Sequence, residues 1–439
     1  MTLSYVGKSL LICHTDCEDL ELSLLNLLSN SPCLLGIKLK YINKEGLKLI
    51  ASSPCCPYLC IINADIGHLS LDILKTICQA CPNLLALNLR TLFSDFSNRH
   101  GNISGDVAIR TILQNCPLIQ MLPESETWYL TNSAMDSLAS IHTLSVLSLG
   151  NNAACSSQSV QRVLQANPNL ARIGLCGPYV DDALLRRIGN CCGNLKYLNV
   201  EIECTAVTNQ ALEDLFRGCP LLVDVRLALS DGVMSNTTLT TLFGSCRELS
   251  VLHLSTSYYS SSPTALGAEY IFDNGYPSLT MVSLSYNAVA DMALRTIFTH
   301  CHGMLDVELD DCDHVTDETI KTLARSCPLL GTLRINTCPM VTVAGVLEVA
   351  SRCTHLISLD LSDIHINDQL LIQLSINCPS LNTLMLQIYD GVVTKVGIAA
   401  VADRCTQLTL FILTGNGIVR TIEQMNANTL YPHIKFVVS

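Results

Sequence analysis

The chain has 439 residues, of which 38 are acidic and 26 basic, so its formal net charge at pH 7 is −12. Hydrophobic residues make up 49% of the chain and charged residues only 15%, which excludes an intrinsically disordered protein, because such chains are polar and highly charged. The negative charge argues against binding to nucleic-acid phosphates or to an anionic membrane surface, so neither is expected as a partner.

The apolar residues are not gathered into a membrane segment. No stretch offers the roughly 20 mainly apolar residues that a spanning helix needs. The apolar run Leu10–Cys13 near the N-terminus has four residues, which is too short for a secretory signal. We therefore expect a cytoplasmic protein, with nuclear or cytoskeletal locations left open, and not a secreted one. Its 23 cysteines are then expected to be buried thiols, because disulfides are rare in reducing compartments.

Residues 1–30 resemble an incomplete version of the pattern that follows. Leu10 and Ile12 suit a strand, and Leu22, Leu25 and Leu28 follow at helical spacing. We interpret residues 1–30 as a partial repeat that caps the rest of the chain.

From residue 31 onward one pattern repeats. The stretches Cys81–Leu89, Cys219–Leu227 and Cys327–Ile335 each place an apolar residue three, six and eight positions after a cysteine. Sixteen such anchor positions fit one frame; thirteen of the fifteen gaps between them are 25 to 27 residues long, and eleven anchors are cysteine. The anchors are Ser31, Cys56, Cys81, Cys116, Ile141, Asn167, Cys192, Cys219, Cys246, Tyr276, Cys301, Cys327, Cys353, Cys378, Cys405 and Tyr431.

Each repeat predicts one strand and one helix. Apolar residues alternate after the anchor, which indicates a short strand with one buried face. Ile320, Leu323 and Ala324 then share one face of a helix. Asp317 is expected to cap that helix, and Cys327 to be its last inward residue, where the thiol can donate to a backbone carbonyl.

The pattern C-x-x-L-x-x-L-x-L, with its period of about 26 residues, resembles the cysteine-containing leucine-rich repeat of F-box/leucine-rich-repeat proteins. Cys312 and Cys338, eleven positions after two of the anchors, match the second cysteine of that family. The resemblance implies an α/β leucine-rich-repeat solenoid (horseshoe) of about 15–16 repeats, with parallel strands on the concave face and helices on the convex face. Residues 31–430 form the repeats and 431–439 a terminal strand. No F-box is recognisable in the thirty residues before Ser31.

Two repeats are longer than the others. The extra residues fall in Arg90–Asp106 and Ser255–Tyr270. Insertions in repeat arrays map to loops, so these segments are either tolerated surface loops or partner contacts.

The sequence predicts no enzyme. It lacks the glycine-rich phosphate loops, the H-E-x-x-H zinc motif and the G-x-S-x-G nucleophile motif. Cysteines buried in apolar surroundings are inert, so no catalytic residue is assigned. Cys55, Cys56 and Cys60 cluster, but no paired C-x-x-C motifs accompany them, and neither a metal nor a cofactor is expected.

A polar surface is predicted on the concave side. Residues five, seven and nine positions after each anchor point outward from the strands, because successive strand residues face opposite sides. In the second half of the chain these positions are largely acidic, which suits a basic or mixed-charge segment of a protein partner, with two apolar neighbours. Alternatively, Glu308, Arg334 and Asp360 pair with one another as an exposed ladder worth ~0–1 kcal/mol. The candidate partner-binding residues are Asp224, Arg226, Val251, His253, Met281, Asp306, Glu308, Asp310, Arg334 and Asp360.

These patterns predict a non-catalytic protein-recognition scaffold. The resemblance implies substrate recognition in SCF-type ubiquitin ligation, with a ligase adaptor as a further partner. The alternative is a structural or regulatory subunit of a cytoskeletal or axonemal assembly, where similar repeats also occur.

Overall fold

The computed structural model describes residues 3–5, 10–13, 28, 31, 33–66, 69–91, 104–122, 129–150, 154–202, 207–229, 234–256, 278–286, 290–387, 393–415, 422 and 427–438. The chain divides into two compact units, residues 1–205 (unit 1) and 206–439 (unit 2). The division of the chain into residues 1–30, 31–430 and 431–439 stays a prediction. Most residues of the two long insertions lie outside the described residues.

Unit 1 alternates short strands with helices. Strands β1 to β5 form one sheet in chain order, and β6, β7 and β8 pair in parallel in a second run. Among the strand pairs in the described residues, only β1–β2 is antiparallel, and β1 was not predicted. The elements of unit 1 are β1 (Leu3–Tyr5), β2 (Leu10–Cys13), β3 (Gly36–Ile42), α2 (Lys44–Ala51), η1 (Cys56–Tyr58), β4 (Ile61–Ile66), α3 (Leu71–Ala80), β5 (Ala86–Thr91), α4 (Gly105–Asn115), α5 (Asn132–Leu138), β6 (Val146–Leu149), α6 (Ser157–Ala166), β7 (Arg172–Cys176), α7 (Asp182–Cys191) and β8 (Tyr197–Glu201).

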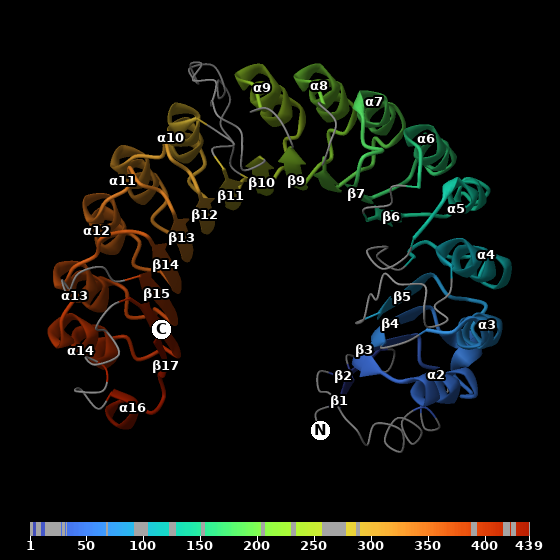
Figure 1. Cartoon of the computed structure of the whole chain (residues 1–439), viewed down its shortest axis with the longest axis horizontal. Helices are drawn as coiled ribbons and strands as arrows, with labels where there is room; N and C mark the ends of the chain where they lie inside the picture. Colours follow the sequence, from blue (N-terminus) through green and yellow to red (C-terminus); the bar gives the residue numbers. More distant parts are fainter. Residues whose placement is uncertain are drawn as a thin grey trace. The chain divides into compact units, whose positions relative to one another are not determined.

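Unit 2 follows the same plan with greater regularity. Strands β9 to β17 pair in parallel, each with its neighbour in the chain, and the helices lie along the other side of the strands (Figure 1). The elements of unit 2 are α8 (Asn209–Gly218), β9 (Asp224–Leu229), α9 (Asn236–Ser245), β10 (Val251–Thr256), β11 (Met281–Ser285), α10 (Asp291–His300), β12 (Asp306–Asp310), α11 (Asp317–Ser326), β13 (Thr332–Asn336), α12 (Val343–Arg352), β14 (Ser358–Ser362), α13 (Asp368–Asn377), β15 (Thr383–Gln387), α14 (Lys395–Arg404), β16 (Leu410–Thr414), α16 (Ala427–Leu430) and β17 (Lys435–Val438). The fold is a leucine-rich-repeat solenoid, as predicted.

The core lies between the strands and the helices of each repeat. In β12, for example, Val307 and Leu309 are fully buried, whereas the residues between and beside them are partly exposed. Ile320 and Leu323 of α11 are also fully buried. Because one strand and one helix cannot cover each other's apolar faces alone, each repeat depends on the neighbours stacked against it.

After the anchor Cys116 the described residues run to Leu122 and resume at Tyr129, so most of the strand expected there lies outside the described residues. Within the described part, Met121 forms a parallel bridge with Ala86.

The anchor residues end the helices and link the repeats. Eleven anchors are C-caps, one position beyond the last helical residue, whereas the prediction placed the anchor inside the helix: Cys81, Cys116, Asn167, Cys192, Cys219, Cys246, Cys301, Cys327, Cys353, Cys378 and Cys405. The thiol of Cys327 donates to the carbonyl oxygen of Cys301 (3.3 Å), Cys353 to that of Cys327 (3.7 Å) and Cys378 to that of Cys353 (3.6 Å). The predicted thiol–carbonyl contact is therefore present, and it joins consecutive repeats. The cysteines in the described part of the chain are free thiols, and most of them are buried.

A second link joins the helix starts. The carboxylate of Asp317 accepts hydrogen bonds from the backbone N–H and the hydroxyl of Thr342, both at 2.7 Å, and Thr342 is the N-cap of the next helix. Asp368 binds Thr394 in the same way, at 2.8 and 2.5 Å. The prediction that Asp317 caps its own helix was wrong: Thr316 is the N-cap of α11, and Asp317 connects that helix to α12.

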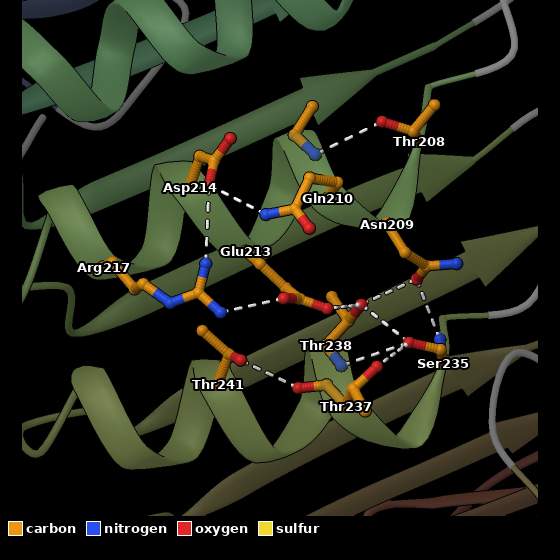
Figure 2. Close-up of polar contacts among 11 residues, drawn as sticks. Thr208, Asn209, Gln210, Glu213, Asp214, Arg217, Ser235, Thr237, Thr238 and Thr241 are labelled. Carbon is orange, nitrogen blue, oxygen red and sulfur yellow. Dashed lines mark hydrogen bonds and ion pairs between the residues drawn. The ribbon is translucent and has the colours of Figure 1, made fainter.

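In the link between α8 and α9 the acceptor is an amide (Figure 2). The side-chain oxygen of Asn209 accepts from the backbone N–H of Ser235 (2.9 Å) and from the hydroxyl of the buried Thr238 (2.7 Å). Glu213 accepts from Thr238 (3.4 Å) and pairs with Arg217 (2.9 Å). These polar contacts join α8 to α9 on the helix side of the repeats.

Candidate functional site

The ten predicted binding residues all lie on six parallel strands of unit 2, β9 to β14. The pairing register places Arg226, His253, Ser283, Glu308 and Arg334 next to one another, strand by strand, and Asp360 follows on β14. A second row lies two residues before the first in each strand and runs from Asp224 through Val251 and Met281 to Asp306. Asp310 is the last residue of β12. We call the ten predicted residues the strand face. Their predicted alignment is confirmed, whereas their binding role stays a prediction.

Two arginines neutralise part of the acidic charge. Arg226 donates from Nε and Nη2 to the two carboxylate oxygens of Asp224, at 3.0 and 3.2 Å. Arg334 donates from Nε to Asp360 (3.2 Å), and its Nη1 lies 4.0 Å from Oε1 of Glu308. The alternative of a paired ladder therefore applies to Glu308, Arg334 and Asp360, as an interaction of modest strength because Arg334 is 46% exposed.

Two serines support the ladder, and the predicted site did not include them. Ser283 donates to Oε2 of Glu308 (3.0 Å) and is almost fully buried beneath the strand face. Ser362 donates to Oδ1 of Asp360 (3.3 Å). The only sequence signal for their role is the repeat frame, which places Ser283 in the central row and Ser362 two residues after Asp360, at the end of β14.

Burial shifts the ionisation of two groups on this surface. Partial burial raises the pKa of Asp360, and the nearby Arg334 guanidinium opposes the shift. Burial and the positive charge of Arg226 lower the pKa of His253, against the carboxylates of Glu308 and Asp224. Hydrogen bonding to Asp224 raises the pKa of Arg226. Because the pKa of His253 is lowered from its ordinary value near 6.5, its imidazole is neutral at pH 7.

The acids in excess are on β12. The strand face contains five acidic residues and two arginines, a balance of 2 − 5 = −3. Within the described part of the chain, no lysine or arginine pairs with Asp306 or Asp310, which flank the paired Glu308. These carboxylates are about 13 Å apart along the strand, since four residues separate them. They are available to a cationic partner.

The acidic surface continues into the turn after β12. Asp311 has a left-handed backbone conformation (φ 51°), as do Thr337 (φ 49°) and Asp363 (φ 63°) at the same position of the next two repeats. The Thr337 hydroxyl donates to Oδ2 of Asp363 (3.2 Å). Burial, followed by the negative charge of Asp310, raises the pKa of Asp311. The same turn thus follows the C-terminal ends of β12, β13 and β14.

Among the described residues, no three His, Cys, Asp or Glu side chains come together in a way that could hold a metal ion. The same part of the chain has no helix that is both long enough and apolar enough to cross a membrane.

The sequence is similar to F-box proteins. It is 31% identical over 121 residues to the F-box protein SKIP1 of Arabidopsis thaliana, covering 27% of this chain and 39% of that protein. It is 24% identical over 291 residues to the F-box/LRR-repeat protein 4 of Bos taurus, covering 64% of this chain and 37% of that protein. The chain thus spans less than two fifths of the length of these curated relatives. No model of a known protein family matches the chain.

Solved structures of similar architecture share little sequence with this chain. The structure of the yeast Rad7 and Elc1 complex aligns with a TM-score of 0.42 and 16% identity, covering 85% of this chain and 74% of the solved chain. The TLR13–ssRNA13 complex aligns with a TM-score of 0.37 and 14% identity, covering 88% and 58%.

Proposed function

We propose that this protein is a non-catalytic recognition scaffold that binds a basic or mixed-charge segment of a partner protein on the strand face of unit 2. The observation that carries the proposal is the placement of Asp306 and Asp310, two acids without a basic partner in the described chain, on either side of Glu308, which pairs with Arg334. A segment with lysine or arginine can pair with these acids without breaking the existing ion pairs.

The neighbouring residues suit such an interface. Val251 and Met281 are paired neighbours in the row that leads to Asp306, and both are partly exposed. An apolar centre beside a charged border is common in protein–protein interfaces. The parallel sheet holds these side chains in fixed positions. Most of the conformational entropy lost on binding is therefore lost by the partner segment.

The biological setting that we propose is substrate recognition in SCF-type ubiquitin ligation, with a ligase adaptor as a second partner. The similarity to two proteins named as F-box proteins supports this setting. The matched regions cover a minority of both relatives, so their activities come to this chain only as a proposal.

The test is affinity purification of the tagged full chain followed by quantitative mass spectrometry. The double variant Asp306→Lys, Asp310→Lys should lose the partner of the strand face. The matched control, Glu248→Lys with Glu318→Lys, makes the same change in net charge at exposed positions away from this face. Loss of the partner from both variants, or from neither, would show that the strand face is the wrong site.

The same experiment tests the setting. Recovery of cullin and adaptor subunits with the wild-type chain supports ubiquitin ligation. Recovery of tubulin or motor proteins in their place would reject that setting and favour the cytoskeletal alternative.

A further inference from the structure

Two large aliphatic side chains are exposed at the same repeat position beside the strand face. Leu305 is 43% exposed and Ile357 53%. Gly331 occupies this position in the repeat between them and adds no side chain. We call these three residues the edge patch. Single exposed leucines are ordinary on a protein surface, but a contiguous group of this kind marks a place where another molecule binds.

The backbone ladder shows that the edge patch is contiguous. Leu305, Gly331 and Ile357 are the residues immediately before β12, β13 and β14. The N–H of Gly331 donates to the carbonyl of Leu305 (2.8 Å), and the N–H of Ile357 donates to that of Gly331 (2.7 Å). A Cβ at Gly331 would lie 4.0 Å from Cδ1 of Ile357, so this side chain leans toward the glycine. The three positions therefore form one continuous strip across three strands.

Polar residues limit the strip on both sides. The corresponding position before β11 is Thr280, whose hydroxyl bonds to Ser250. Before β15 it is Asn382, whose side chain donates to the carbonyl of Gln407 (2.8 Å). The apolar strip thus covers only the start of β12, β13 and β14, the three strands that also carry the paired ladder and the two available acids.

The edge patch and the available acids are adjacent in the chain. Leu305 immediately precedes Asp306, so an apolar contact surface and a carboxylate lie one residue apart. A partner segment that pairs a cation with Asp306 therefore lies within one residue's spacing of Leu305, at the start of the same strand. The carboxylate and the apolar surface together suit a segment that has a basic residue next to an apolar one.

Resting on the function proposed above, we infer that the edge patch binds a large apolar side chain that stands next to a lysine or arginine in the partner segment. The partner is then a basic segment with interspersed apolar residues, and a purely hydrophilic basic tail binds more weakly. The acids provide charge complementarity, and the edge patch provides the selection among basic segments.

The experiment compares three synthetic peptides by fluorescence anisotropy with the full chain. Each peptide has a glycine–serine background. The first carries two lysines with a leucine beside each, the second has serine in place of the leucines, and the third has glutamate in place of the lysines. The first peptide should bind about tenfold more tightly than the second, because a half-exposed aliphatic side chain offers tens of Å² of apolar surface to cover. The third should not bind.

Two variants assign this gain to the edge patch. In the double variant Leu305→Ser, Ile357→Ser, the affinities of the first and second peptides should differ by no more than about twofold. The affinity of the second peptide should stay as in the wild type. Both residues are exposed, so their replacement leaves the core intact. Leu221→Ser is the matched control, since Leu221 is 43% exposed, as Leu305 is, and lies in another repeat outside the edge patch. It should preserve the full gain.

The outcomes separate the two proposals. The inference about the edge patch would be overturned if the first two peptides bound the wild type equally, or if the tighter binding of the first peptide persisted in the double variant. Either result would leave the proposed function of the strand face standing. Peptide binding that is indifferent to Asp306→Lys with Asp310→Lys would overturn the proposed function. Absence of any binding up to about 1 mM would overturn both.

Discussion

Replacing Gly345 by alanine should weaken the junction between two repeats, although alanine is the better helix former. Gly345 is the third residue of α12, and a Cβ built on it would lie 2.6 Å from Oδ1 of Asp317 and 3.2 Å from its Cα. The Asp317 carboxylate holds the N–H and hydroxyl of Thr342. A methyl group at position 345 therefore displaces the acceptor of both hydrogen bonds.

The net effect follows from two opposing contributions. Alanine gains up to ~1 kcal/mol over glycine from helix propensity. Loss of two hydrogen bonds to a carboxylate costs about 2–3 kcal/mol at this partly exposed site. The variant should therefore lower the free energy of local unfolding by about 1–2 kcal/mol, which corresponds to an increase of about 5–30-fold in the open population.

Hydrogen–deuterium exchange of the full chain, read on peptides from α11 and α12, measures this change, since exchange reports local opening in a repeat array. Gly244→Ala in α9 is the matched control, because nothing lies within 4 Å of a Cβ there. It should slow exchange or leave it unchanged, with a gain of ~0.5–1 kcal/mol. Slower exchange in α12 of Gly345→Ala would refute the role of the Asp317–Thr342 link.

Two further predictions concern ionisable groups. Burial raises the pKa of the thiols of Cys246, Cys327 and Cys353 to about 12, so at pH 8 the thiolate fraction of each is roughly a thousandth of that of an ordinary cysteine. Iodoacetamide should therefore label the exposed Cys33 before these three thiols. Labelling of all four cysteines at the same rate in the native protein would contradict this burial. Folding lowers the pKa of His253 and so favours its neutral form. The contribution of His253 to the free energy of unfolding is therefore fully present above its unfolded pKa of about 6.5, and it is lost as pH falls through its folded pKa. The urea midpoint of unit 2 should therefore fall between pH 7.5 and 5.5 in the wild type and fall less in His253→Gln, whereas an equal fall in both would assign the effect to other groups.

The sequence predicted those features that depend on the repeat alone. The spacing of the anchors located the strands and the helix ends, because each repeat must bury the same faces against its neighbours. The alternation of side chains within a strand placed Arg226, Glu308 and Asp360 in one row before any coordinates were known. The second-cysteine prediction also has a structural counterpart, since the thiols of Cys312 and Cys338 donate to backbone carbonyls.

Other features depend on side-chain geometry between repeats, which a single sequence does not encode in a periodic form. The role of Asp317 changed from cap to link because its rotamer reaches Thr342 of the next repeat. Whether Arg334 pairs with Asp360 or remains available to a partner is decided by a few torsion angles. The edge patch was missed because its residues lie just outside the strand positions from which the surface was read.

The most direct test of the account is to locate the bound partner by site-specific photo-crosslinking. A benzophenone side chain at Thr332, between Asp306 and Ser358 on the strand face, should crosslink to the protein that copurifies with the wild-type chain. The same group at the exposed Ser351 on α12 should not. A crosslink from position 351 and none from position 332 would place the partner on the helix side and contradict the account.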